Sequence, residues 1–168
     1  MSSIIQVDRS IRPDYSDGGM RPRKLLHPEL ETIGPAEFDV RGLMLWVPPD
    51  QPESWLQGCL TGQSIYNYLE ANNMLSKCLS LRDLEEIKKK GIRFYQKHFA
   101  HDDTNMNHYS LSAWKSVVEA TDGGGVVQLY VPVLHYGDGR VFVGWGCLIF
   151  SNWCAPLSRT PLFAEETL

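Results

Sequence analysis

The chain has 168 residues, of which 43% are hydrophobic and 21% are charged, so the sequence predicts one domain with a buried core. This length excludes a two-domain enzyme and a large barrel. Lys and Arg number 16 against 20 Asp and Glu, and the net charge of -4 disfavours general nucleic-acid binding, because proteins held to phosphates usually carry a basic surplus.

Neither a membrane segment nor a secretory signal is visible in the sequence. The longest apolar stretches, 126–134 and 141–150, are far shorter than the roughly 20 residues of a spanning helix. The N-terminus lacks the charged start, the long apolar middle and the cleavage site of a signal peptide. We therefore expect a cytoplasmic protein.

The four cysteines are spread along the chain without a CxxC pair. This spacing is typical of reduced thiols and not of a disulfide framework or a zinc ribbon. We expect all of them to be small buried hydrophobic residues: Cys59, Cys78, Cys147 and Cys154.

Residues 1–39 combine basic side chains with prolines and the breaker Asp-Gly-Gly at 17–19, which is typical of an extended arm with turns. Within it, residues 4–7 are rich in isoleucine and valine. We expect them to form an edge strand that ties the arm to the body, because free termini are otherwise often disordered. Residues 40–168 then form the single domain.

Residues 61–99 carry helical patterns. Thr61 or Ser64 can cap a first helix. Ser80 is a candidate N-cap of a second helix, with Asp83 three residues further on and apolar side chains at three- to five-residue steps. We expect this second helix to continue as far as residue 99.

The last third of the chain has the alternation of β-strands. Strands are predicted within 126–134 and 141–150, and the Asp138-Gly139 pair between them is a strong hairpin signal. Pro132 predicts an edge or a bulge, because proline donates no ladder hydrogen bond. With a third strand at 112–118, the predicted fold is α+β: an antiparallel three- to four-stranded meander packed on two or three helices, with an extended N-terminal arm.

Glycines at several positions need separate interpretation. Gly91 lies inside the second predicted helix, where glycine costs about 1 kcal/mol relative to alanine, so we expect close approach of a neighbouring backbone. The triple glycine at 123–125 precedes a strand and not a helix, which does not fit a phosphate-binding loop. Gly144 and Gly146 indicate that one face of the hairpin lies close under a bulky group. No motif predicts a cofactor.

His98, His101, Asp102, Asp103 and His108 are the best candidates for a metal site, because imidazole and carboxylate groups bind divalent metals. A small hydrolase or transferase could use such a site, with or without metal. However, 101–108 is also an ordinary polar loop between a helix and a strand, and its spacings match no known ligand pattern.

A cysteine nucleophile paired with a histidine base is a further catalytic hypothesis. The candidate thiols are Cys154 and Cys59, and the candidate bases are His27, His98, His108 and His135. Nothing near these residues in the sequence favours catalysis over a buried structural role.

The five tryptophans are numerous for this length. Trp114 and Trp145 lie among apolar strand neighbours and are predicted to be in the core. Trp46, Trp55 and Trp153 lie in proline-containing stretches, so we expect them at the surface as a partner-binding site.

Lys88, Lys89 and Arg93 form a basic cluster, and helices followed by a hairpin are the element order of a winged-helix DNA-binding protein. The segment lacks a short polar turn for reading bases, however. Its lysines are also what the solvated face of an amphipathic helix carries.

Four segments resemble small prokaryotic proteins of unknown function: IIQVDRSIRP at 4–13, LLHPELE at 25–31, GPAEFDV at 34–40 and LRDLEEIKKKGIRFYQKHF at 81–99. The resemblance covers most of the chain and implies a bacterial or phage setting. It implies no activity, cofactor or site residue.

The sequence as a whole favours a non-catalytic macromolecule-binding or regulatory protein that acts through an aromatic surface and its N-terminal arm. The expected partner is another protein or a second copy of the chain. The alternatives are the small hydrolase or transferase with the His/Asp loop and the winged-helix DNA-binding protein.

Overall fold

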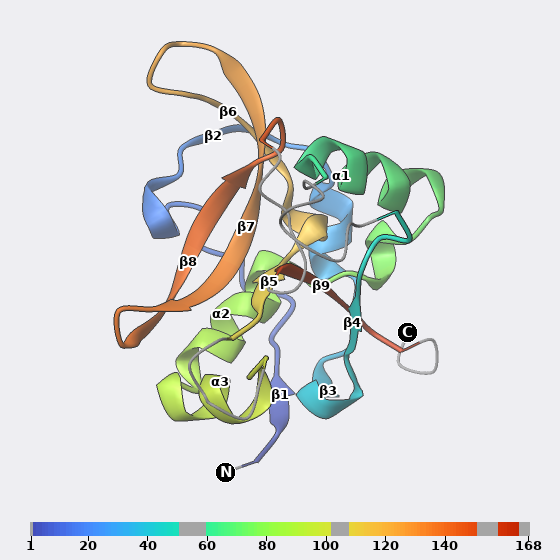
Figure 1. Ribbon diagram of the computed structural model, residues 1–168, viewed down its shortest axis with the longest axis vertical. Coiled ribbons are helices and arrows are strands. Elements are labelled where there is room, and N and C mark those ends of the chain that lie inside the picture. The colour runs from blue at the N-terminus through green and yellow to red at the C-terminus, as the bar shows by residue number, and fades with distance from the viewer. Residues whose placement is uncertain (1, 51–59, 102–107, 151–157, 165–168) are drawn as a thin grey trace.

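The computed structural model describes residues 2–50, 60–101, 108–150 and 158–164 (Figure 1). These residues form a seven-stranded sheet, a separate two-stranded sheet and three α-helices. The mixed α and β content predicted from the sequence is confirmed. No helix of the described part is both long and apolar enough to cross a membrane.

The N-terminal segment is built into the fold through two strands. β1 (Ile4–Gln6) pairs antiparallel with β3 (Glu37–Asp39), and β2 (Pro22–Leu25) pairs antiparallel with β6 (Val118–Thr121) of the large sheet. The short strand expected at 4–7 does form, but it pairs with β3 in the small sheet.

Short 3-10 turns connect the strands of this first part of the chain. They are η1 (Asp17–Gly19), η2 (Pro28–Thr32) and η3 (Val40–Gly42). The arm is therefore a series of strands and turns that pack on the rest of the protein.

α1 (Gly62–Ala71) begins at Thr61, whose hydroxyl accepts a hydrogen bond from the Ser64 backbone N–H. The short turn η5 (Leu75–Lys77) follows it. α2 (Leu81–Lys89) begins with a complete capping box between Ser80 and Asp83, as the sequence predicts.

The predicted second helix is in fact two helices, because α2 ends before Gly91 and α3 (Ile92–His98) begins after it. Gly91 has a φ of 83°, which L side chains rarely adopt, and no atom lies within 4 Å of the place where a Cβ would be. The expectation of a close neighbour was therefore wrong. Glycine is needed here for the backbone conformation between the two helices.

The large sheet runs in the order β2-β6-β7-β5-β9-β4, and β8 pairs with the other edge of β7. Its remaining strands are β4 (Met44–Trp46), β5 (Ser110–Ser112), β7 (Val127–Gly137), β8 (Arg140–Cys147) and β9 (Ser158–Leu162). β5 and β9 are parallel and all other pairs are antiparallel. The expected meander corresponds only to β6, β7 and β8, and the strand expected at 112–118 is split by the turn η6 (Trp114–Ser116).

The predicted hairpin forms between β7 and β8, with Asp138 and Gly139 both at positive φ. Pro132 lies between the β7 residues that pair with β6 and those that pair with β5, and its carbonyl accepts from the Ala113 N–H. Pro132, which has no N–H to donate, therefore lies where the partner of β7 changes from β6 to β5.

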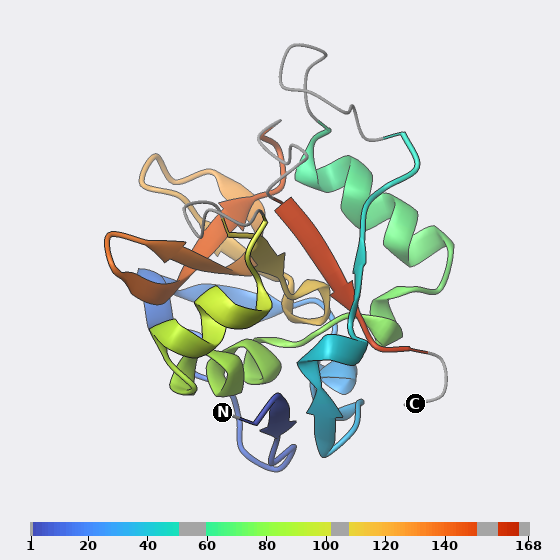
Figure 2. The same ribbon diagram turned by 60° about the horizontal axis from the view of Figure 1, so that its bottom comes forward.

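Successive residues of β7 point to opposite faces of the sheet, so the protein has two core clusters. Leu134 packs with α2 and α3 on one face, whereas Val131 and Val133 pack with α1 and the fully buried Trp114 on the other. Figure 2 shows the two helix groups on either side of the strands.

Candidate functional site

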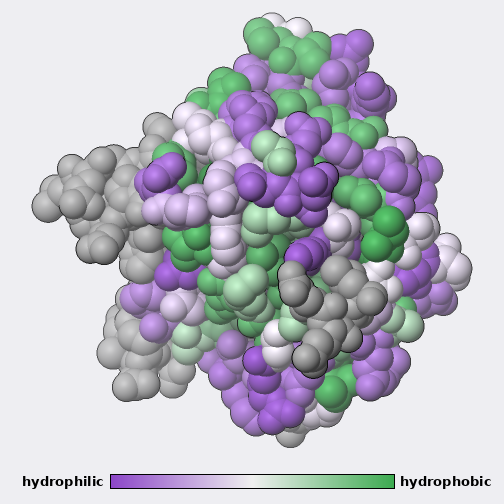
Figure 3. Space-filling model, turned by 90° about the vertical axis from the view of Figure 1, so that its right-hand side faces the viewer, coloured by the Kyte–Doolittle hydropathy of each residue, from purple (hydrophilic) through white to green (hydrophobic). Residues whose placement is uncertain are grey.

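Of the three tryptophans predicted to bind a partner, only Trp46 lies within the described residues. Trp46 lies on β4, at the edge of the large sheet, where it is half-buried and its ring stacks on Tyr68 with centroids 5.5 Å apart. The side of the molecule with α1 and β4 has hydrophobic residues in its middle, with hydrophilic residues around and between them (Figure 3). Trp55 and Trp153 lie outside the described residues.

Each described histidine of the predicted metal segment lies against an aromatic ring. His98 lies 4.6 Å from Phe94, His101 5.4 Å from Tyr109, and the buried His108 4.4 Å from Tyr136, measured between ring centroids. Burial lowers the pKa of His98, and the charge of Lys97 acts in the same direction.

No group of three metal-binding side chains occurs in the part of the chain that the structure covers. Asp102 and Asp103 lie outside it.

The proposed cysteine nucleophiles Cys59 and Cys154 also lie outside the described residues. Cys78 and Cys147 are buried free thiols, and burial raises the pKa of Cys78 to about 12, so its reactive thiolate form is suppressed. Two of the candidate bases have hydroxyl partners: His27 lies 2.6 Å from the Tyr66 oxygen, and His135 lies 3.0 Å from the Ser110 oxygen.

Nearby carboxylates neutralise most of the predicted basic cluster. Lys88 forms an ion pair with Asp17 at 2.7 Å, and Lys89 forms one with Glu86, also at 2.7 Å. Arg93 on α3 is exposed. Because the first turn of α2 is buried in the protein, this helix does not present its N-terminus as a recognition helix would.

A group of exposed apolar side chains lies at the end of the sheet where β7 begins and β8 ends. Val126, Val127, Ile149 and Phe150 are 54%, 44%, 52% and 57% exposed, respectively. Pairing continues past β8, since the Leu148 N–H donates to the Leu129 carbonyl. We call these four residues, with the groove beside them, the ribbon-end surface.

The groove of the ribbon-end surface has a volume of about 330 Å³. Its walls include Gln128, Tyr130, Trp145, Ile149 and Phe150. Asp122 is the one charged residue among the described residues that line it, and the Asp122 carboxylate already accepts the backbone N–H groups of Gly124 and Val126. The groove is therefore mainly apolar and aromatic.

The N-terminal segment supports one wall of this groove. The Trp145 indole N–H donates to the carbonyl of Asp17 at 2.7 Å, and the Tyr15 ring stacks near the indole. Gly18 lies so close to β8 that a Cβ there would come within 2.7 Å of the Val143 oxygen. Glycine at this position is required both by this approach and by its φ of 73°.

A second site contains four charged residues that the fold brings together in its interior: Arg9, Glu31, Asp83 and Lys115. The Arg9 guanidinium lies 2.7 Å from Asp83 and also donates to the carbonyl of Pro35. Lys115 is fully buried and donates to the carbonyl of Ile33 at 2.6 Å.

Glu31 connects the turn η2 to this cluster. Its carboxylate accepts hydrogen bonds from the Tyr15 hydroxyl at 2.6 Å and from the Ser116 hydroxyl. Burial raises the pKa of Glu31, while the two hydroxyl groups act against this effect. Burial also lowers the pKa of Lys115 to about 8, against the opposing charge of Asp83.

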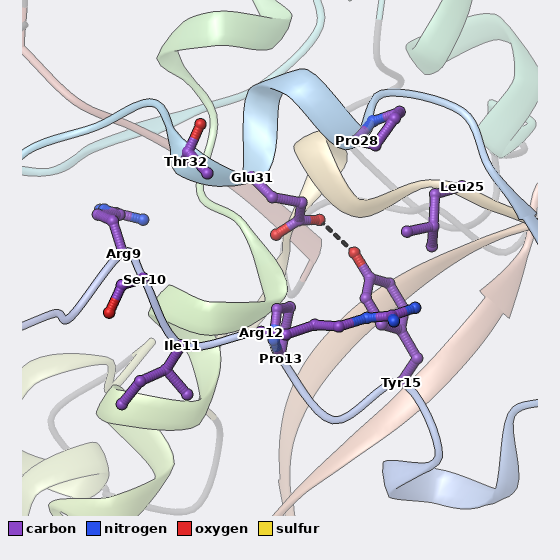
Figure 4. Close-up of a pocket in the computed structure, with 10 residues that line it drawn as sticks. All are labelled: Arg9, Ser10, Ile11, Arg12, Pro13, Tyr15, Leu25, Pro28, Glu31 and Thr32. Atoms are coloured by element: carbon purple, nitrogen blue, oxygen red, sulfur yellow. Dashed lines mark hydrogen bonds between the residues drawn. The ribbon is translucent and has the colours of Figure 1, made fainter.

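A pocket of about 430 Å³ lies next to these residues, between the segment 9–15 and the turn η2 (Figure 4). Glu31 and Tyr15 form part of its wall, and Arg12 extends across the Tyr15 ring in this view. The sequence analysis missed this site, because its members lie far apart in the chain and only Asp83 had a local signal, as a capping residue.

Comparison of the chain with protein-family models, curated proteins and solved structures finds no match in any of the three.

Proposed function

We propose that this protein acts by binding another protein through the ribbon-end surface. The observation that carries the proposal is the exposure of four large apolar side chains, Val126, Val127, Ile149 and Phe150, at the same end of one sheet. Scattered single apolar residues are normal on a protein surface, whereas a group beside a groove is typical of an interaction site.

The chemistry of the groove favours a protein partner with apolar side chains. Tyr130 and Trp145 offer aromatic walls, which are enriched at the centres of protein interfaces. The one charged residue in the described part of the lining is acidic, so these residues give no attraction to nucleic-acid phosphates.

In this proposal the N-terminal segment contributes indirectly. The hydrogen bond to the Asp17 carbonyl and the stacking with Tyr15 fix the orientation of the Trp145 ring, so this wall of the groove is in place before the partner binds. A rigid aromatic side chain loses little conformational entropy on binding, which strengthens the interaction. The arm expected to take part in binding would then act through Trp145, which is not one of the three tryptophans predicted to bind a partner.

The proposal is tested by replacing Phe150 with the photo-crosslinking residue p-benzoylphenylalanine in the full-length protein, in cells that naturally produce it. We expect an adduct of defined mass with a partner protein or with a second copy of the chain. The adduct should be strongly reduced by Ile149→Asp, which places a charge in the groove.

The matched control is Ile33→Asp, because Ile33 is also an exposed isoleucine but lies in another part of the chain. It should leave the adduct intact. Absence of an adduct, or equal yields from the two aspartate variants, would overturn the proposal.

A further inference from the structure

We infer that the pocket between residues 9–15 and the turn η2 binds a small organic anion, with an apolar body and a single carboxylate or phosphate group. This site is separate from the ribbon-end surface and goes beyond the function proposed above.

The size and walls of the pocket fit the apolar part of such a ligand. Its volume of about 430 Å³ falls within the range of roughly 300 to 1,000 Å³ found for small-molecule sites. Ile11, Pro13 and Leu25 supply aliphatic surface, and Tyr15 adds an aromatic ring. Pro13 and Tyr15 are buried, whereas Ile11 is 48% exposed, so the pocket has both a fixed inner wall and an accessible side.

One basic side chain of the pocket is open to an anion. Among the described residues, three ionisable side chains other than Tyr15 line the pocket: Arg9, Arg12 and Glu31. Arg9 is neutralised by Asp83. Arg12 has neither an ion pair nor a hydrogen bond with any described residue, so its guanidinium is available to a ligand.

Glu31 is bound to other groups than Arg12. One of its oxygens accepts hydrogen bonds from the hydroxyl groups of Tyr15 and Ser116, and it forms no ion pair with Arg12. In the view of Figure 4 the carboxyl group of Glu31, on η2, points toward the Tyr15 hydroxyl. Arg12, on the same segment as Tyr15, extends across the Tyr15 ring.

A guanidinium group is well suited to the bound anion, because its planar donors pair with two oxygens of a carboxylate or a phosphate. In this arrangement the anionic group lies at Arg12, and the apolar body lies against Tyr15, Leu25 and Pro13. Arg12 provides orientation and charge selection, and the apolar wall provides contact area.

The test uses benzoate and phenyl phosphate as probes, in titration calorimetry with the full-length protein. We expect one or both to bind, and their relative affinities distinguish a carboxylate site from a phosphate site. Benzyl alcohol has the same ring without the charge and should bind at least about tenfold more weakly.

Arg12→Gln should weaken binding of the preferred anion by about tenfold or more, whereas Arg93→Gln should not change it. Arg93 is the matched control, because it is also an exposed arginine and lies on α3, outside the pocket. Circular dichroism of both variants checks that the fold is kept. The inference is wrong if neither anion binds at millimolar concentration, if benzyl alcohol binds as well, or if the two glutamine variants behave alike.

Discussion

The Asp83 carboxylate contacts both Ser80, at the start of its own helix, and Arg9 of the N-terminal segment. One oxygen accepts the backbone N–H and the hydroxyl of Ser80 in the capping box of α2, and the other lies 2.7 Å from the Arg9 guanidinium. The Asp83 side chain is completely buried and that of Arg9 is 12% exposed. The first turn of α2 therefore provides the counter-ion that holds the arm.

Arg9→Met should destabilise the protein by about 3 to 5 kcal/mol, because it leaves the Asp83 carboxylate buried without its ion-pair partner. Urea unfolding followed by circular dichroism measures the loss. The double variant with Asp83→Asn should lose less than the sum of the two single changes, since the charge left alone is then removed as well.

The control for this experiment is Arg41→Met. Arg41 also forms an ion pair with an aspartate, Asp39, but this pair lies at the surface, where solvent screens it. We expect little change in stability. Equal effects of the two methionine substitutions would contradict the assigned role of the buried pair.

Lys115 should contribute stability that increases with pH between about pH 8 and pH 10. Burial lowers its pKa from the ordinary 10.5 to about 8 in the folded protein. In this range Lys115 is more protonated in the unfolded chain than in the folded chain, so its contribution to the free energy of unfolding increases as pH rises. Below pH 8 both states carry the charge, and this contribution is constant.

Urea midpoints of the unaltered protein and of Lys115→Met, measured across this pH range, check the prediction. The comparison with the variant is needed because burial also raises the pKa of Cys78 and of Tyr15, and both groups lower the stability when they ionise in the unfolded chain. The midpoint of the unaltered protein should increase relative to that of the variant from pH 8 to pH 10. A difference between the two midpoints that stays constant or falls would exclude the assigned behaviour of Lys115.

Gly18→Ala should displace η1 from β8. It should lower the stability of the protein and weaken partner binding at the ribbon-end surface. The new methyl group would meet the Val143 oxygen at 2.7 Å, in addition to the strain of a φ of 73°. Gly19→Ala is a close control, because Gly19 has a φ of 82° but no atom within 4 Å of its Cβ position.

Both alanine variants should lose about 1 to 2 kcal/mol from backbone strain, and Gly18→Ala should lose about 1 to 3 kcal/mol more from the clash. Urea unfolding measures both losses. If the two variants are equally stable, the close contact between η1 and β8 does not contribute.

Local signals in the sequence predicted those elements that depend on neighbouring residues. Asp138-Gly139 specifies its turn through backbone conformation, and Ser80 with Asp83 specifies the start of α2 through side-chain hydrogen bonds. Both were confirmed. Each needs only residues within a few positions of one another, so periodicity and capping chemistry suffice to find it.

Contacts between distant segments could not be predicted in this way. β5 and β9 are parallel neighbours although their paired residues, such as Ser110 and Ser158, are 48 positions apart in the chain. Each strand has only a few residues, too few for a clear alternation. Glu31 and Lys115 likewise appear ordinary in the sequence, and only the fold takes them out of water. The site formed by the four charged residues could therefore be found only from the structure.

Replacement of Gly91 by alanine distinguishes one continuous helix from two helices, because the two interpretations predict stability changes of opposite sign. If one helix ran through this position, Gly91→Ala would stabilise the protein by about 1 kcal/mol, since alanine has the higher helix propensity. In the structure Gly91 instead joins α2 and α3 with a φ of 83° and a ψ of -178°, a conformation that is almost confined to glycine. Alanine should then cost about 1 to 3 kcal/mol.

Gly42→Ala controls for the general effect of replacing glycine, because Gly42 has no positive φ and no atom within 4 Å of its Cβ position. It should be neutral or slightly stabilising, through the reduced freedom of the unfolded chain. Thermal and urea unfolding of the two variants decide between the interpretations. A stabilised Gly91→Ala variant would show that α2 and α3 form one continuous helix, whereas a destabilised one, with Gly42→Ala unchanged, supports the break at Gly91.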